Sequence, residues 1–141
     1  MAAVAATAVG PAAQAFGRET GIAVAALQSA PDATVSALLN LLDHVQAYGG
    51  PKQVCLFPRL NLSEGDLATL ADAARKYDCT LHFGQVSVAT AIGTYRVTAV
   101  AAGKSAGRTA IVAPDGQVIA LARTTAQQAV AAVLPAGQVR A

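Results

Sequence analysis

The alternation of short apolar runs with amphipathic helical segments is the feature that most constrains how this chain folds. Residues 22–28 and 53–57 are nearly continuous apolar runs, a pattern typical of strands that are covered on both faces. Between them, apolar residues recur at helical spacing over 35–45, and a Gly-Gly-Pro sequence at 49–51 ends that helix. The first half of the chain therefore begins as a strand, a helix and a second strand.

A second helix and a third strand follow with the same spacing. Apolar residues at helical spacing predict a helix that follows Ser63 and extends to Tyr77, and residues 80–88 alternate as a strand does. Asp32 and Ser63 are the side chains expected to cap the two helices. The β-α-β-α-β order predicts parallel strands joined by right-handed helical crossovers.

From Tyr95 the pattern changes to consecutive strands joined by turns. The Pro-Asp-Gly sequence at 114–116 is typical of a tight turn, and strands are expected over 95–102, 108–113, 117–122 and 130–134. The predicted fold class is α/β, with one mixed sheet and two helices on one face. That arrangement leaves an apolar second face, so we expect another copy, another subunit or the N-terminal segment to cover it.

The length of 141 residues fits one domain over 21–141. Residues 1–20 are Ala-rich and are expected to form a flexible tail, since they lack the basic start and Leu-rich centre of a signal peptide. No run has the character of a membrane span. A cytoplasmic location is expected, with an organelle matrix as the alternative because no acidic residue precedes Glu19.

Charge and aromatic content limit the partners. A formal charge of +2 and 4% aromatic residues argue against nucleic-acid binding. The charge is uneven, because residues 80–141 carry five basic side chains and one acidic one, a net of +4. Chance in an Ala-rich chain explains this, and the alternative is a positive face for a subunit or an anionic small molecule.

Few residues suggest chemistry. Cys55 and Cys79 are 24 positions apart in apolar stretches, which indicates packing, a reducing compartment and no zinc pattern. Neither His44 nor His82 has a Cys or Asp residue at a sequence spacing that would indicate a catalytic or metal site. The Gly-Lys-Ser sequence that contains Lys104 lacks the upstream Gly of a phosphate-binding loop and is expected to be a hairpin turn. We expect no metal and no cofactor.

The order of these segments resembles the nitrilase (carbon–nitrogen hydrolase) superfamily. The resemblance rests on Ile-Ala-Val-Ala-Ala-Leu-Gln-Ser-Ala-Pro at 22–31, on Val-Cys-Leu-Phe-Pro-Arg-Leu at 54–60, and on the paired strands of 95–122. It implies a shortened αββα sandwich. The family uses a Glu base, a Lys and a Cys nucleophile to transfer the acyl group of an amide or nitrile.

Two departures from the family pattern imply a catalytically dead relative. Arg59 stands where the family has its Glu, and a guanidinium cannot accept the proton of a thiol. The family's middle section, with its Lys and Cys, has no counterpart between Val88 and Tyr95. The expected function is that of a non-catalytic nitrilase-like subunit with a structural or regulatory role. It would dock through an apolar sheet face on its own copy or on a larger enzyme subunit.

Two alternatives remain open. The chain could be a small amide or nitrile hydrolase, or an acyltransferase, with Cys55 or Cys79 as its nucleophile. It could also be a sensor of a small anionic ligand held by Arg59, Lys104 and Arg108.

Overall fold

The computed structural model describes residues 21–103 and 108–140, so the expected tail 1–20 and Lys104 lie outside the described residues. The elements follow in the order β1 (Ile22–Gln28), α2 (Val35–Ala47), β2 (Val54–Phe57), α3 (Glu64–Tyr77), β3 (Thr80–Phe83), β4 (Gln85–Thr90), β5 (Gly93–Thr98), β6 (Ala110–Val112), β7 (Val118–Leu121), β8 (Gln128–Leu134) and β9 (Gly137–Arg140). In the described part of the chain, neither helix is long and apolar enough to cross a membrane.

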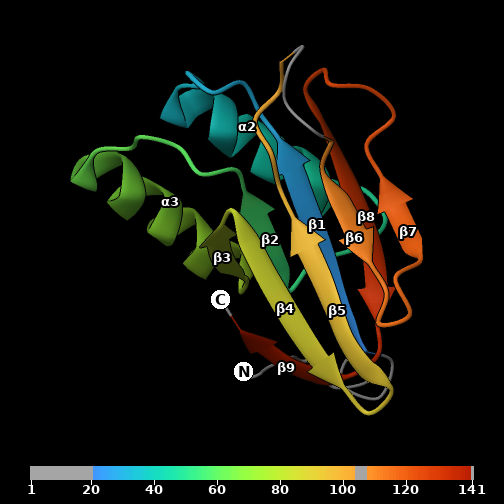
Figure 1. Cartoon of the computed structure of the whole chain (residues 1–141). Helices are drawn as coiled ribbons and strands as arrows, with labels where there is room; N and C mark the ends of the chain where they lie inside the picture. Colours follow the sequence, from blue (N-terminus) through green and yellow to red (C-terminus); the bar gives the residue numbers. More distant parts are fainter. Residues whose placement is uncertain (1–20, 104–107, 141) are drawn as a thin grey trace.

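The strands form two sheets, and the helices form a third layer (Figure 1). The mixed sheet has the order β3-β2-β1-β8, in which β1, β2 and β3 are parallel and β8 is antiparallel to β1. The antiparallel sheet has the order β7-β6-β5-β4-β9. The α/β class is therefore confirmed, whereas the expected single sheet is wrong.

Gly84 is the residue at which the chain passes from one sheet to the other. Its N–H donates to the carbonyl of Phe57 at 2.7 Å, and its own carbonyl accepts from the N–H of Ala99 at 2.9 Å. Gly84 has a φ of +85°, which an L-residue with a side chain rarely adopts. The strand expected over 80–88 is thus two strands, because the apolar alternation continues across a turn that only the backbone reveals.

The antiparallel sheet covers one face of the mixed sheet, and the helices cover the other. The core between the sheets includes Val24 and Leu56 of the mixed sheet and Val86, Val97 and Ile111 of the antiparallel sheet. The second core places helix residues against the opposite face, among them Leu38, Leu42 and Leu70 against Leu27 and Phe57. The expectation that the mixed sheet needs a partner on its second face is therefore corrected, since the chain covers that face itself.

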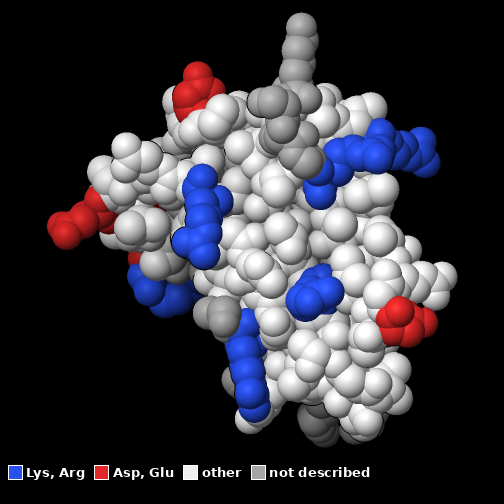
Figure 2. Space-filling model, in the orientation of Figure 1, with Lys and Arg blue, Asp and Glu red and all other residues white. Residues whose placement is uncertain are grey.

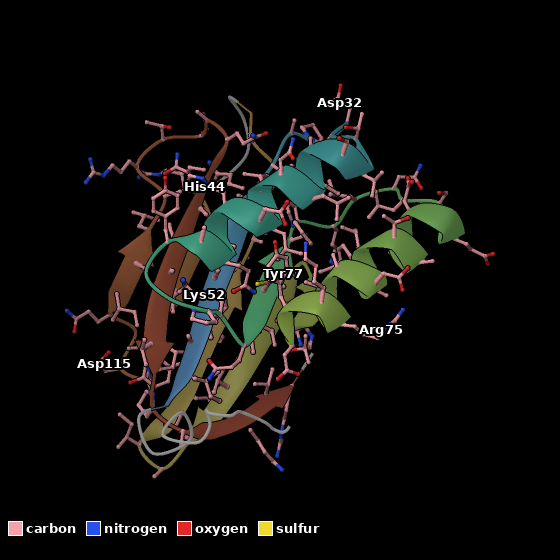
Figure 3. All side chains as sticks on the ribbon, turned by 180° about the vertical axis from the view of Figure 1, so that it is seen from behind. Asp32, His44, Lys52, Arg75, Tyr77 and Asp115 are labelled. Atoms are coloured by element: carbon pink, nitrogen blue, oxygen red, sulfur yellow. The ribbon has the colours of Figure 1, made fainter. Side chains whose placement is uncertain are left out.

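Local signals place the helices as expected, with one change. The Ser63 hydroxyl accepts from the N–H of Asp66 at 3.1 Å and caps α3, as predicted. Thr34, rather than Asp32, caps α2, because its hydroxyl accepts from the N–H of Ala37 at 3.2 Å. The two helices lie side by side over the mixed sheet (Figure 3), and the Tyr77 hydroxyl donates to the Asp43 carboxylate between them.

Gln28 joins the end of β1 to two distant loops. Its side chain is fully buried, and its Oε1 accepts from the N–H of Thr109 at 2.8 Å. Its Nε2 donates to the carbonyls of Thr124 at 2.8 Å and Ala126 at 2.7 Å. This one amide therefore fixes the loop that enters β6 and the loop that leaves β7 against the mixed sheet.

We predict that Gln28→Leu lowers the free energy of unfolding by about 2 kcal/mol, because it leaves the buried N–H of Thr109 without its acceptor. The carbonyls of Thr124 and Ala126 each lose one of two donors, since the Gln128 amide also contacts both. Urea unfolding followed by circular dichroism measures the change. Gln117→Leu, at an exposed position, is the control, and its effect is expected to stay below about 0.5 kcal/mol. Equal effects of the two substitutions would contradict the structural role of Gln28.

Candidate functional site

The carboxyl ends of the three parallel strands are the first place to search, because α/β folds often bind ligands there. Gln28 is at this edge, but its amide is used in the contacts described above. The next residue, Ser29, is fully buried, and its hydroxyl has no hydrogen-bond partner in the structure. Arg59, which follows β2, is the charged side chain at this edge, and it is exposed.

Arg59 packs across Gly84. A Cβ added to Gly84 would lie 2.7 Å from the Arg59 Nε and 2.9 Å from its Cγ. No salt bridge between described residues involves Arg59. The Arg59 guanidinium is permanently charged and cannot accept a proton.

The expected anion site is only partly described. Arg108 donates from its Nη1 to the Arg123 carbonyl at 3.2 Å, which places it beside the loop between β7 and β8. Among the described residues, no hydrogen bond or salt bridge connects Arg108 with Arg59. With Lys104 outside the described residues, a site made of all three stays a prediction.

The two cysteines lie together beneath the helices. Cys55 of β2 is fully buried, and Cys79, just before β3, is partly buried in the same cluster. The Gln46 Nε2 donates to the Cys55 Sγ at 3.6 Å. Hydrogen bonding to Cys79 and burial raise the pKa of the Cys55 thiol, whereas the hydrogen bond from Cys55 lowers the pKa of Cys79. Cys79 is therefore the thiol that ionises first.

Neither histidine lies beside these thiols; the charged groups that act on them are Lys52, near Cys55, and Asp78, next to Cys79. His82 pairs with Leu56 across β3 and β2, and Leu56 faces the core between the sheets. The thiols face the helices, so His82 lies on the opposite face of the sheet; burial lowers its pKa. His44 is exposed and packs on Tyr48, with ring centroids 4.4 Å apart. Residues 21–103 and 108–140 also contain no cluster of three His, Cys, Asp or Glu able to hold a metal ion.

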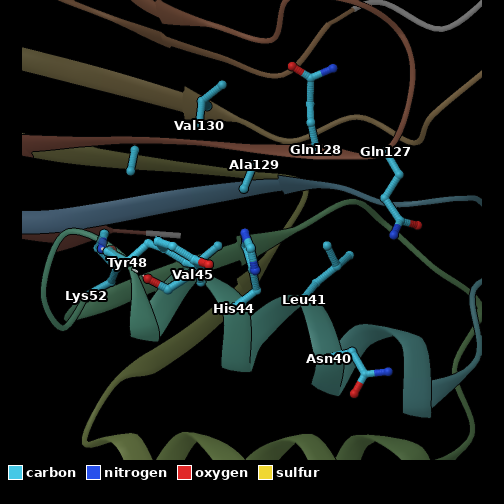
Figure 4. Close-up of a pocket in the computed structure, with 11 residues that line it drawn as sticks. Asn40, Leu41, His44, Val45, Tyr48, Lys52, Gln127, Gln128, Ala129 and Val130 are labelled. Carbon is cyan, nitrogen blue, oxygen red and sulfur yellow. Dashed lines mark hydrogen bonds between the residues drawn. The ribbon is translucent and has the colours of Figure 1, made fainter.

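A groove of about 550 Å³ runs between α2 and β8 (Figure 4). It is lined by Leu41, Val45 and Ala129, among others. Lys52 also lines it, but its ammonium donates to the carbonyls of Val45, Tyr48 and Gly50 at 3.1, 2.7 and 2.6 Å. These bonds use all three N–H groups of the lysine to cap the end of α2, so no donor of this side chain is left for a ligand in the groove.

The outer face of the antiparallel sheet has no covering layer among the described elements. Both helices pack on the mixed sheet, and no other described element lies over this face (Figure 1). The register places Arg96, Ser87 and Arg140 in one row across β5, β4 and β9. Exposed Val118 and Leu121 of β7 lie toward the opposite side of the sheet.

Sequence reasoning did not single out Arg96 or Arg140. Two signals were present: the positive charge of residues 80–141, and the alternation of Thr94, Arg96 and Thr98 with buried Tyr95 and Val97. The alternation could have shown that Arg96 faces outward. The meeting with Arg140 could not be found, because β9 pairs with β4 across a long sequence separation.

Comparison of the chain with protein-family models, curated proteins and solved structures found no significant match.

We predict that iodoacetamide modifies Cys79 about tenfold faster than Cys55 in the folded protein, because Cys79 is more exposed and ionises more readily. The thiolate is the reactive form, so the rate at Cys79 should rise with pH around a midpoint below the ordinary thiol value of 9.0. Peptide mass mapping over time measures both rates. Cys79→Ser should abolish the fast phase; faster labelling of Cys55 would contradict the assignment.

Proposed function

We propose that this chain is a non-catalytic, nitrilase-like binding subunit that docks on a protein partner through the outer face of its antiparallel sheet. The observation that carries the proposal is the outer face of the five-stranded sheet, over which none of the described elements packs, whereas described elements cover both faces of the mixed sheet. The family resemblance implies a four-layer αββα sandwich. The described layers are helix, sheet and sheet, so the uncovered face is where a fourth layer would pack.

The side chains on this face fit contact with a protein. Leu121 and Val118 are 43% and 49% exposed, and small residues such as Ala110 and Ser87 let a partner approach the strands closely. Apolar groups near arginines are common at the centre of protein interfaces. The face therefore offers both apolar contact and directed hydrogen bonds.

The arrangement of reactive groups supports a non-catalytic role. Acyl transfer needs a nucleophile beside a base. The thiol that ionises more easily, Cys79, has Cys55 and Gln46 as its hydrogen-bond partners, and neither supplies a base at neutral pH. Arg59 takes the position at which the resemblance places the base. For the alternative of a thiol-dependent amide or nitrile hydrolase, no described histidine lies beside either thiol. The charged neighbours are Asp78, next to Cys79, and Lys52, whose ammonium is held by three carbonyls.

We predict that Leu121→Glu disrupts the native assembly, whereas Leu67→Glu does not. The two leucines are 43% and 42% exposed, and Leu67 is on α3, so the pair matches residue, exposure and substitution on different layers. Light scattering after gel filtration of the complex from the native source measures the mass. The wild type and Leu67→Glu should exceed the chain's own 14.1 kDa.

Leu121→Glu should elute as the 14.1 kDa chain alone. A wild-type chain that is monomeric both in its native extract and after purification would overturn the proposal, as would an assembly that Leu121→Glu leaves intact. Circular dichroism of both variants establishes that each remains folded.

A further inference from the structure

The row of side chains across β5, β4 and β9 carries two like charges at a defined spacing. Ser87 pairs with Arg96 on one side and with Arg140 on the other. Neighbouring strands lie about 4.8 Å apart, so the two arginine backbones are separated by about 10 Å. Both arginines are exposed and point away from the core, because Tyr95, Val97 and Val139 of the same strands point into it.

No described acidic residue neutralises this row. The salt bridge found among residues 21–103 and 108–140 joins Arg75 to Asp72 on α3, in another layer. Arg140 donates from its Nη2 to the Gln138 Oε1 at 3.1 Å, which orients the guanidinium but leaves its charge. The neighbouring rows of this face hold neutral side chains, namely Gln85, Thr98, Ala89 and Thr94.

Figure 2 shows the same distribution over the whole face. Lys and Arg side chains are spread across it, and Asp and Glu side chains lie at its rim. Arg59, packed against Gly84 at the start of β4, adds a third guanidinium at this end of the sheet. Asp115 is in the turn between β6 and β7, where its carboxylate accepts from the N–H of Gln117 at 2.9 Å.

We infer that the partner of this face is a different protein that presents an acidic segment, with carboxylates spaced to meet Arg96 and Arg140. The inference rests on the proposed function and specifies its partner. Arginine binds a carboxylate through two parallel N–H bonds, which supplies orientation as well as charge. Thr94, Thr98 and Ser87 can donate further hydrogen bonds beside the pair.

The charge of this face also favours a different protein over a second copy of the chain as its partner. In a two-fold dimer the same patch meets itself, so arginine would face arginine with no acid between them. A head-to-tail contact could bring the face onto the acidic residues of α3, such as Glu64 and Asp72. Such a contact is heterologous and would give closed rings or open polymers of the chain. An acidic segment of another protein would meet the face without bringing arginine against arginine and without joining copies of the chain.

The test follows the backbone amides of the purified full-length chain by ¹⁵N–¹H nuclear magnetic resonance. An eight-residue glutamate peptide is the probe, and an eight-residue lysine peptide is its control. We expect the glutamate peptide to shift amides of β4, β5 and β9 and to leave α3 unchanged. The lysine peptide should shift neither set, and added NaCl should weaken the binding.

Charge reversal tests the named residues. Arg96→Glu and Arg140→Glu should each raise the dissociation constant of the glutamate peptide about tenfold, since each loses an attraction and adds a repulsion. Lys76→Glu makes the same change of net charge on α3 and should alter the constant less than about twofold. Equal losses in all three variants, or shifts centred on another layer, would overturn the inference.

Sedimentation separates failure of this inference from failure of the proposed function. If the purified chain forms a dimer or polymer that Leu121→Glu dissociates, the outer face is confirmed as a docking surface, and the inference of an acidic protein partner is wrong. A chain that neither binds the peptide nor assembles through Leu121 would overturn both. A monomer that binds the peptide through Arg96 and Arg140 supports the inference.

Discussion

The sheet-to-sheet crossing at Gly84 determines the rest of the structure. One backbone unit closes the mixed sheet through its N–H and opens the antiparallel sheet through its carbonyl. The left-handed φ of +85° makes the crossing possible within a single residue. A side chain there would collide with Arg59, so the glycine leaves room for that side chain to pack across the crossing. The two sheets face each other because the chain turns here without a connecting loop.

Because the chain forms a second sheet after Gly84, both faces of the mixed sheet are covered. The face without a described covering layer belongs to the antiparallel sheet. The mixed sheet is apolar on both sides, and the helices and the antiparallel sheet bury both. The antiparallel sheet has one apolar face and one face of small, polar and basic residues, a division typical of sheets that are solvated on one side. Interfaces that form reversibly are about as polar as the rest of a protein's surface, so a face of this composition is compatible with the proposed contact.

The sequence was sufficient for elements whose signals are local, and insufficient where contacts are distant. The strand over 22–28, the helices and the Ser63 cap are specified by periodicity and by a side chain three residues from its partner. The sheet crossing was missed because alternation continues through 80–88. β9 was missed because Gly137–Arg140 has no apolar run and is defined by its pairing with β4. The row of Arg96 and Arg140 depends on that same distant pairing.

The placement of charge favours recognition of a surface over chemistry on a small molecule. A catalytic site needs polar groups that converge in a shielded space, where low polarity strengthens their effect. Here the two buried side chains with the most hydrogen bonds hold the fold: Gln28 joins three segments, and Lys52 caps α2. Arg96 and Arg140 lie instead on an exposed sheet face, at a spacing set by strand register. Groups held at fixed separations on a rigid, open face can select a partner by the pattern of its charges.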